Sequence, residues 1–129
     1  MLQFKDTCII EPKTLVHDRI FAVLQMLCDP PLSLPLIVTA VRDGHTEGAH
    51  VRGEAVDVRT SNLTSEQITK LMFQLKSRLG QKFFVQYEVK EHTQGLVRVF
   101  EVVNPRATAP HVHVQLAMGM TFKREAMIA

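Results

Sequence analysis

The sequence has few cysteines, little charge imbalance and no long apolar run. Its only cysteines, Cys8 and Cys28, form no Cys-x-x-Cys pair, so we expect reduced thiols rather than a disulfide framework or a thiolate metal site. Fifteen basic and thirteen acidic residues leave a net charge of +2, which does not predict a nucleic-acid partner. Residues 1–6 lack the features of a signal peptide, and no run could cross a bilayer. We expect synthesis in the cytoplasm and no membrane insertion.

The content of apolar residues is that of an ordinary globular protein. Hydrophobic residues make up 46% of the sequence and charged residues 22%, which argues against a disordered or fibrous chain. A chain of 129 residues can bury an apolar core without the help of disulfides. We therefore predict one domain over residues 1–129.

Two segments show the apolar periodicity of helices. In residues 12–29 apolar side chains recur at helical spacing, and the Pro-Pro pair that follows prevents continuation. Thr64 and Gln67 form the pattern of a capping box that opens a second helix, which should end at Gly80. We predict that two stripes face the core, one from each helix: Val16, Ile20, Val23, Leu24 and Leu27, and then Ile68, Leu71, Met72, Leu75 and Leu79.

Five runs rich in β-forming residues predict strands at 36–41, 54–59, 82–90, 96–103 and 111–117. Turn residues join the last three runs, so we expect them to form a meander or hairpin pair of antiparallel strands. The order of helices and strands lacks the alternation of a parallel βαβ sheet. We therefore predict an α+β fold, with an antiparallel sheet, two main helices packed against it and a single compact domain.

Histidines and a carboxylate fall into two clusters that suit a metal. His50 precedes Asp57 by seven positions, and Gly53 permits a turn that could fold His50 back toward Asp57. His111 and His113 flank a valine in a predicted strand, so they should share one face. Zinc binds imidazole and carboxylate, and a catalytic site has three protein ligands and one open position. Either cluster alone is more typical of a polar surface, and coincidence in an ordinary domain remains an alternative.

Together the two clusters resemble the zinc D-Ala-D-Ala carboxypeptidases and their relatives, which include phage L-alanyl-D-glutamate endolysins, murein endopeptidases and the Hedgehog signalling-domain fold. Residues 111–113 match the His-x-His of this family, and residues 39–42 resemble its strand end Ser-Gly-Tyr-Arg. Gly48 replaces the serine of the pattern Ser-x-His-x-x-Gly-x-Ala-x-Asp. Four other positions match that pattern in register: His50, Gly53, Ala55 and Asp57.

The resemblance implies a zinc peptidase of bacterial cell walls. By it, His50, Asp57 and His113 would hold one zinc ion, His111 would assist catalysis, and Arg42 would contact the substrate or transition state. The implied substrate is a peptidoglycan stem peptide, cut by a D,D-carboxypeptidase or an L-Ala-D-Glu type endopeptidase that uses a zinc-bound water. Such an enzyme would reach the wall after lysis or as part of a phage particle, where virion proteins would be its partners.

A protein that retains this fold and its metal without catalysis is the main alternative. It would be a structural or virion-associated protein, in line with the Hedgehog-like relatives that use the scaffold for binding. The missing serine at Gly48 favours this alternative, as does the lack of the Glu-x-x-His that supplies a base in the dipeptidase branch.

The other histidines, Glu47 and the methionines near the C-terminus are not among the residues that we predict to form the site. His17 and His92 should be solvated surface residues. His45 and Glu47 lie in the loop before His50, where a plain polar loop explains them as well as substrate contact does. The methionines near the C-terminus should pack in the core rather than form a docking tail: Met118, Met120 and Met127.

Overall fold

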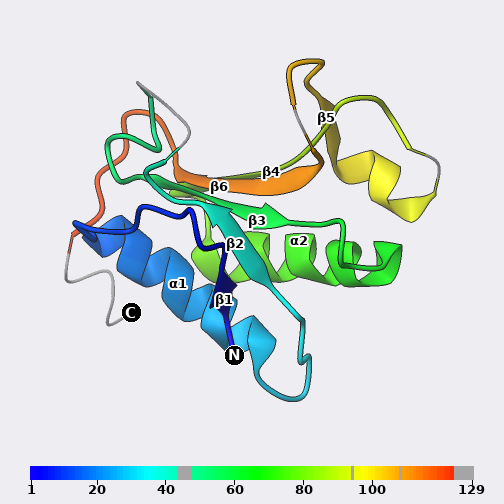
Figure 1. Cartoon of the computed structure of the whole chain (residues 1–129), viewed down its shortest axis with the longest axis horizontal. Helices are drawn as coiled ribbons and strands as arrows, with labels where there is room; N and C mark the ends of the chain where they lie inside the picture. Colours follow the sequence, from blue (N-terminus) through cyan, green and yellow to red (C-terminus); the bar gives the residue numbers. More distant parts are fainter. Residues whose placement is uncertain (44–47, 94, 108, 124–129) are drawn as a thin grey trace.

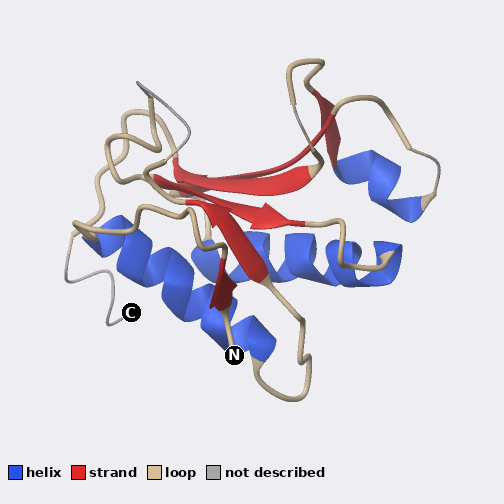
Figure 2. Cartoon of the chain, viewed as in Figure 1, coloured by secondary structure: helices blue, strands red, loops and turns tan. Residues whose placement is uncertain are grey.

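The computed structural model places a six-stranded sheet over helices in two layers, within one compact α+β domain (Figure 1). The two long helices cover the same face of the sheet (Figure 2). Residues 1–43, 48–93, 95–107 and 109–123 are described. The elements in chain order are β1 (Gln3–Phe4), α1 (Leu15–Cys28), β2 (Ile37–Ala40), β3 (Ala55–Arg59), α2 (Ser65–Leu79), β4 (Phe83–Val89), the 3-10 helix η1 (Leu96–Phe100), β5 (Glu101–Val103) and β6 (His111–Leu116).

The sheet is mixed, so the prediction of an antiparallel sheet is wrong. Its strand order is β1-β2-β3-β6-β4-β5, in which β1 runs parallel to β2 and β4 parallel to β5. The antiparallel meander of the last three runs is also wrong, because η1 replaces most of the strand expected at 96–103. Phe100 of η1 packs edge-on against Phe73 of α2, with ring centroids 5.2 Å apart. The chain therefore crosses over before β5, and β6 inserts between β3 and β4.

Both predicted helices and their apolar stripes are confirmed. α1 begins after Thr14 and α2 after Thr64, and each threonine side chain accepts a hydrogen bond from the backbone three residues on. The side chain at that third position bonds back to the threonine N–H, which completes a capping box in both helices. α2 ends at Gly80, whose φ of 75° suits glycine. Every residue of the two predicted stripes is buried.

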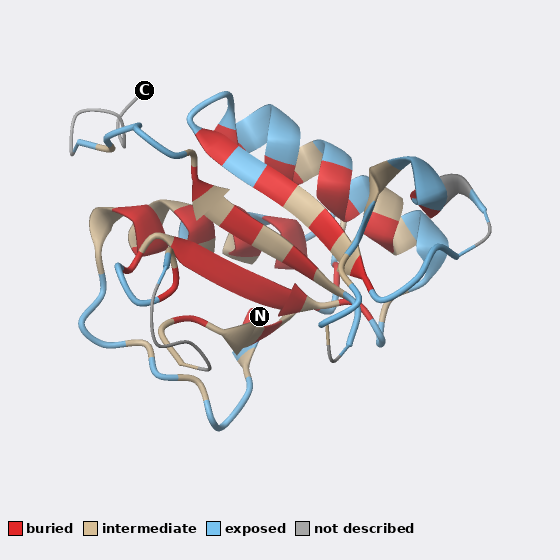
Figure 3. Ribbon diagram, turned by 90° about the horizontal axis from the view of Figure 1, so that it is seen from above, coloured by how far each residue is buried: buried red, intermediate tan, exposed pale blue. Residues whose placement is uncertain are grey.

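The core lies between the helices and the apolar face of the three central strands. Side chains alternate along β3, β6 and β4, so their valines point toward the helices while polar residues point away. Buried and less buried residues alternate along β4 and β6 in Figure 3. Full burial of a valine or leucine stabilises the fold by about 1.5–3 kcal/mol. The central valines are all buried: Val56, Val58, Val85, Val112 and Val114.

His17 is fully buried, so the prediction that it is a solvated residue is wrong. It occupies the third position of α1, where its Nδ1 lies 3.3 Å from the N–H of Thr14 and completes the capping box. Its ring stacks on Phe21, with centroids 5.7 Å apart. Burial, reinforced by the positive charge of Arg42, lowers the pKa of His17 to about 4. His17 is therefore neutral near pH 7 and accepts the bond from Thr14.

The structure settles several smaller predictions. His92 is exposed, as predicted, whereas Met118 and Met120 are 95% and 44% exposed, so the prediction that they pack in the core is wrong. Both methionines follow β6, where the chain leaves the sheet and its apolar layer. Cys8 and Cys28 are free thiols. Among the described residues no helix is both long and apolar enough to span a membrane. Outside the described residues lie Met127, His45 and Glu47.

His17→Gln should make stability less dependent on pH. The pKa of His17 is about 4 in the fold against 6.5 for the free side chain, so between these values the unfolded chain binds more protons. Stability that is present above pH 6.5 is therefore lost as the pH falls, by about 2 kcal/mol between pH 7 and pH 5. Glutamine can keep the capping box but does not titrate. Urea denaturation at both pH values checks this, and equal losses in parent and variant would contradict it.

Candidate metal centre

Three neighbouring strands align polar side chains on the sheet face that the long helices leave uncovered. Strand pairing sets Asp57 of β3 and Gln86 of β4 on either side of His113 of β6, and it sets Glu88 of β4 beside His111. Residues that pair directly across antiparallel strands point to the same face. Two carboxylates, two imidazoles and one amide therefore gather on this face.

His50 reaches the same place from the loop before β3. Gly53 has a φ of 76°, in the left-handed region, and its N–H donates to the carbonyl of His50 over 3.1 Å. The N–H of Glu54 donates to the carbonyl of Ala49 over 2.9 Å. These two bonds close a tight turn, which folds His50 back toward Asp57 as the spacing of the motif predicts.

The N-terminus of α1 fastens this turn. The hydroxyl of Thr14 donates to the carbonyl of Gly53 over 2.6 Å and also accepts the capping bond from the N–H of His17. A Cβ on Gly53 would lie 2.5 Å from Cγ2 of Thr14 and 2.6 Å from a guanidinium nitrogen of Arg42. Close packing therefore requires glycine at this position, in addition to the backbone angle.

Arg42 lies behind the loop rather than beside the metal position. Its guanidinium donates to the carbonyl of Pro12 over 2.8 Å and to that of Val51 over 2.7 Å. Arg42 is not among the described residues that line the pocket. The structure therefore does not bring Arg42 together with the other predicted site residues. Its guanidinium holds the His50 loop against the segment that precedes α1.

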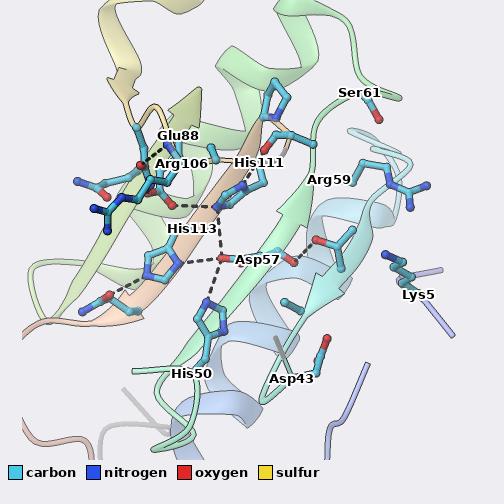
Figure 4. A pocket seen from close by; sticks show the side chains of 18 residues that line it. Lys5, Asp43, His50, Asp57, Arg59, Ser61, Glu88, Arg106, His111 and His113 are labelled. Carbon is cyan, nitrogen blue, oxygen red and sulfur yellow. Dashed lines mark hydrogen bonds and ion pairs between the residues drawn. The ribbon is translucent and has the colours of Figure 1, made fainter. Parts of the chain in front are cut away.

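His50, Asp57 and His113 meet at one point (Figure 4). The Oδ1 atom of Asp57 lies 2.8 Å from Nδ1 of His113 and 3.3 Å from Nε2 of His50. One donor atom from each residue lies within 4.8 Å of the others. Ligand atoms at 2.0–2.2 Å around a tetrahedral metal are separated by roughly 3.3 Å. The three predicted ligands are therefore brought together at a spacing that could hold a metal ion.

The outer ring nitrogens of both histidines face oxygen acceptors. Nδ1 of His50 lies 2.9 Å from the carbonyl of Val41, and Nε2 of His113 lies 2.6 Å from Oε1 of Gln115. A carbonyl oxygen can only accept, so in neutral imidazoles these outer nitrogens carry the protons and the inner ones present lone pairs to Asp57. Lone pairs and a carboxylate repel each other unless protons or a cation lie between them. The centre of the group can therefore be filled either by protons on the inner nitrogens or by a cation.

The charges of the group are strongly biased even without a metal. Burial acts to raise the pKa of Asp57, but hydrogen bonds from His113 and His50 outweigh it and hold that pKa well below its usual value. Burial acts to lower the pKa of His113, and the contact with Asp57 raises it instead. Asp57 is therefore a carboxylate near neutral pH. A metal ion has to displace a proton from the imidazole of His113, so binding of the metal should weaken as the pH falls.

His111 adjoins the group and has a carboxylate partner of its own. Its Nε2 lies 2.8 Å from Oε2 of Glu88 and 3.8 Å from Oδ1 of Asp57, and its Nδ1 donates to the carbonyl of Ala109 over 3.0 Å. Burial opposes protonation, but Glu88 and the charge of Asp57 raise the pKa of His111 to about 9. The amide of Asn104 donates to the other oxygen of Glu88 over 3.3 Å. His111 is therefore protonated near neutral pH, at the edge of the group.

Sequence reasoning does not single out Glu88, Gln86 or Gln115. The alternation in residues 82–90 could have placed Glu88 and Gln86 on the polar face of their strand, opposite Val85. It could not show that this strand pairs with β6, because η1 and β5 lie between the two in the chain. The register that joins Glu88 to His111 is visible only in the fold.

An open pocket of about 760 Å³ surrounds the group. His50, Asp57, His111 and His113 all line it, and its walls extend across the sheet to the residues that follow β1 and β5. A pocket of this size can hold several residues of a peptide. The group can therefore meet a ligand from solvent, although Asp57 and His50 are themselves buried.

Comparison with protein-family models, with curated proteins and with solved structures gave no significant match. The resemblance to zinc peptidases therefore depends on the matched residues of the two motifs. The geometry of His50, Asp57 and His113 shows independently that these three residues could hold a metal ion.

Gly53→Ala should destabilise the loop that carries His50. A Cβ at this position meets the left-handed φ and atoms at 2.5 and 2.6 Å, so we expect a loss of about 2 kcal/mol or more in the free energy of unfolding. Gly48→Ala is the matched control, because Gly48 has a φ of 94° but nothing within 4 Å of its Cβ. Denaturant titration should show a larger loss for Gly53→Ala. Equal losses would mean that the close contacts do not matter.

Asp57→Ala should weaken metal binding much more than it weakens the metal-free fold. Loss of the only carboxylate among the three donors removes the charge that draws a cation between the imidazoles. We expect affinity for zinc to fall at least ~100-fold, since even residues that merely support a ligand contribute 10–100-fold. Competition with a chromophoric chelator measures the affinity, and melting in excess chelator measures the metal-free fold. Equal destabilisation with and without chelator would mean that Asp57 is structural.

Proposed function

We propose that this protein is a zinc peptidase, a hydrolase that cleaves a peptide bond in the stem peptides of bacterial peptidoglycan. The observation that carries the proposal is the meeting of His50, Asp57 and His113 in an open pocket with His111 beside them. Two imidazoles and one carboxylate form a ligand set typical of catalytic zinc sites. The motif resembles that of D,D-carboxypeptidases and L-Ala-D-Glu endopeptidases, which supports a substrate that contains D-amino acids.

The ligand residues are held ready for the ion. When bound, zinc supplies Lewis acidity and lowers the pKa of a coordinated water toward neutrality. The carbonyl of Val41 orients the ring of His50, and Gln115 orients that of His113, so both inner nitrogens aim at the same point beside Asp57. Preorganised ligands of this kind need only small shifts when the ion enters, because Asp57 and His113, at 2.8 Å, are closer than the roughly 3.3 Å between ligand atoms of a tetrahedral metal.

His111 and Glu88 supply a place to hold a proton next to the ligands. The Nε2 edge of His111 faces Oε2 of Glu88 at 2.8 Å and the oxygen of Asp57 at 3.8 Å, so this edge is turned toward the reacting groups. Because its pKa is about 9, His111 is an imidazolium near neutral pH, so it can give its Nε2 proton to the leaving amine and regain a proton from the water that adds to the carbonyl. Glu88 fixes the ring and stabilises the imidazolium. This strand carboxylate offers what the absent Glu-x-x-His motif supplies in other relatives.

A second candidate is a metal-binding protein without catalysis, with a structural or virion-associated role. Arg42 favours this candidate, because the resemblance assigns it to the substrate but its guanidinium is bound to backbone carbonyls. The pairing of His111 with Glu88 at an open pocket favours the peptidase, because a structural metal site is closed and needs no proton carrier. We therefore rank the peptidase first.

His113→Ala should remove the zinc, whereas His111→Ala should retain it and lose hydrolysis. The parent should carry about one zinc per chain, because its three donors make up the protein ligands of a single catalytic zinc site, whose fourth position stays open for water. Of the two histidines in β6, His113 is one of the three metal donors, whereas His111 is not and instead pairs with Glu88. Loss of a proton carrier should reduce turnover ~10²–10⁴-fold. Elemental analysis and mass-resolved digests of purified peptidoglycan measure both properties, and His92→Ala is the control because His92 is exposed and does not line the pocket.

The outcomes separate the candidates. Loss of metal in His111→Ala and retention in His113→Ala would mean that the two roles are exchanged. A parent that binds one zinc but releases no fragment from peptidoglycan would favour the structural candidate. A parent without stoichiometric metal would overturn both.

A further inference from the structure

Three cationic side chains line the pocket without a partner in the described part of the chain. They are Lys5, Arg59 and Arg106. Their charged groups make no hydrogen bond or ion pair with any other residue that the structure describes. Elsewhere on the surface basic side chains do find partners, such as Arg52 with Glu54 at 2.9 Å.

The carboxylates that line the same pocket, among the residues the structure describes, are all engaged. Asp43 accepts hydrogen bonds from the backbone N–H groups of Ile9 over 3.0 Å and Val41 over 3.1 Å. Glu88 is bonded to an imidazole and Asp57 to two. Because each acid is already satisfied, the cations leave the pocket with positive charge that a ligand can neutralise.

Two of the cations lie on the same side of the metal position. Arg59 ends β3 two residues after Asp57, on the same face of the strand, and their Cα atoms are therefore separated by roughly 7 Å. Lys5 follows β1, and its N–H donates to the carbonyl of Val38 over 2.8 Å. Figure 4 shows Arg59 and Lys5 on one side of Asp57 and Arg106 on the other. The strand order agrees, because β1 and β5 are the opposite edges of the sheet.

We propose that Arg59 and Lys5 form a subsite for a carboxylate of the substrate, so that the preferred substrate is an acidic peptide. The inference depends on the proposed peptidase function, whose scissile bond would lie beside Asp57. A guanidinium binds a carboxylate through two parallel hydrogen bonds, and the ammonium of Lys5 adds a second charge. The separation of roughly 7 Å along β3 places the carboxylate about two residues from the scissile bond.

Matched peptides test the subsite. The zinc-loaded full chain is given a stem pentapeptide, its analogue amidated at the α-carboxylate of D-glutamate, and its analogue amidated at the C-terminus. Amidation of whichever carboxylate occupies the subsite should raise the KM of the parent about tenfold, as expected for the loss of a charge-assisted hydrogen bond, and the other amidation should not. In Arg59→Gln the KM values of the acidic peptide and of that amide should differ by less than about twofold, while the zinc content stays the same. Arg59→Lys should recover part of the preference.

Arg98→Gln is the control, because Arg98 is an exposed residue of η1 that does not line the pocket. It should keep the full preference of the parent for the acidic peptide.

If neither amidation changes the KM of the parent, or if Arg59→Gln raises the KM of the acidic peptide and of its amide equally, the proposed subsite is wrong even though the peptidase function stands. If the parent cleaves none of the peptides, the proposed function fails, and the same pairs are compared by equilibrium binding. If the parent then binds the acidic peptide about tenfold more tightly than its amide, and Arg59→Gln removes the difference, the subsite is supported. If the parent binds both peptides equally, the subsite is overturned.

Discussion

The pairing of β3 with β6 is the constraint on which the rest of the site depends. It sets Asp57 opposite His113 and the valines that flank these two residues opposite one another, so one register builds both the metal group and the core. A slip of one residue would turn the imidazoles toward the helices and the valines toward the pocket. The apolar layer that stabilises the fold therefore also fixes the positions of the donor atoms. β4 extends the same pattern, which is how Glu88 comes to lie beside His111.

His50 is the donor that does not come from the sheet, and its position needs separate support. Thr14, Arg42 and Gly53 supply that support from three parts of the chain. The geometry thus gives Arg42 a structural task on the side of the loop that faces away from the pocket. Among the described residues, the cations of the pocket wall have no hydrogen-bond or ion-pair partner for their charged groups, and Arg59 is placed by the same strand as Asp57.

Features encoded within a few residues could be predicted from the sequence. The capping box of Thr64, the helical stripes and the spacing from His50 to Asp57 are of this kind, because one turn or one helix determines each. The strand order could not be predicted, since η1 interrupts the run that was expected to pair and sends β5 to the edge. The partnership of Glu88 with His111 depends on that order.

Burial and side-chain direction escaped prediction for a similar reason. A histidine at the start of a helix is normally solvated, but His17 serves as the third residue of a capping box under the packed loop. The direction of Arg42 depends on the approach of Pro12 and Val51, which are distant in the chain. Both cases require tertiary contacts that no periodicity encodes.

The hydroxyl of Thr14 joins two structures that would otherwise open independently. It accepts the capping bond that begins α1 and donates to the carbonyl of the turn that carries His50. Helix ends fray readily and loops open readily, but here neither can do so without breaking a bond to the same oxygen atom. The first turn of α1 and the His50 loop are therefore one cooperative unit. An ion bound by His50 would restrain the end of a helix that contributes no ligand to it.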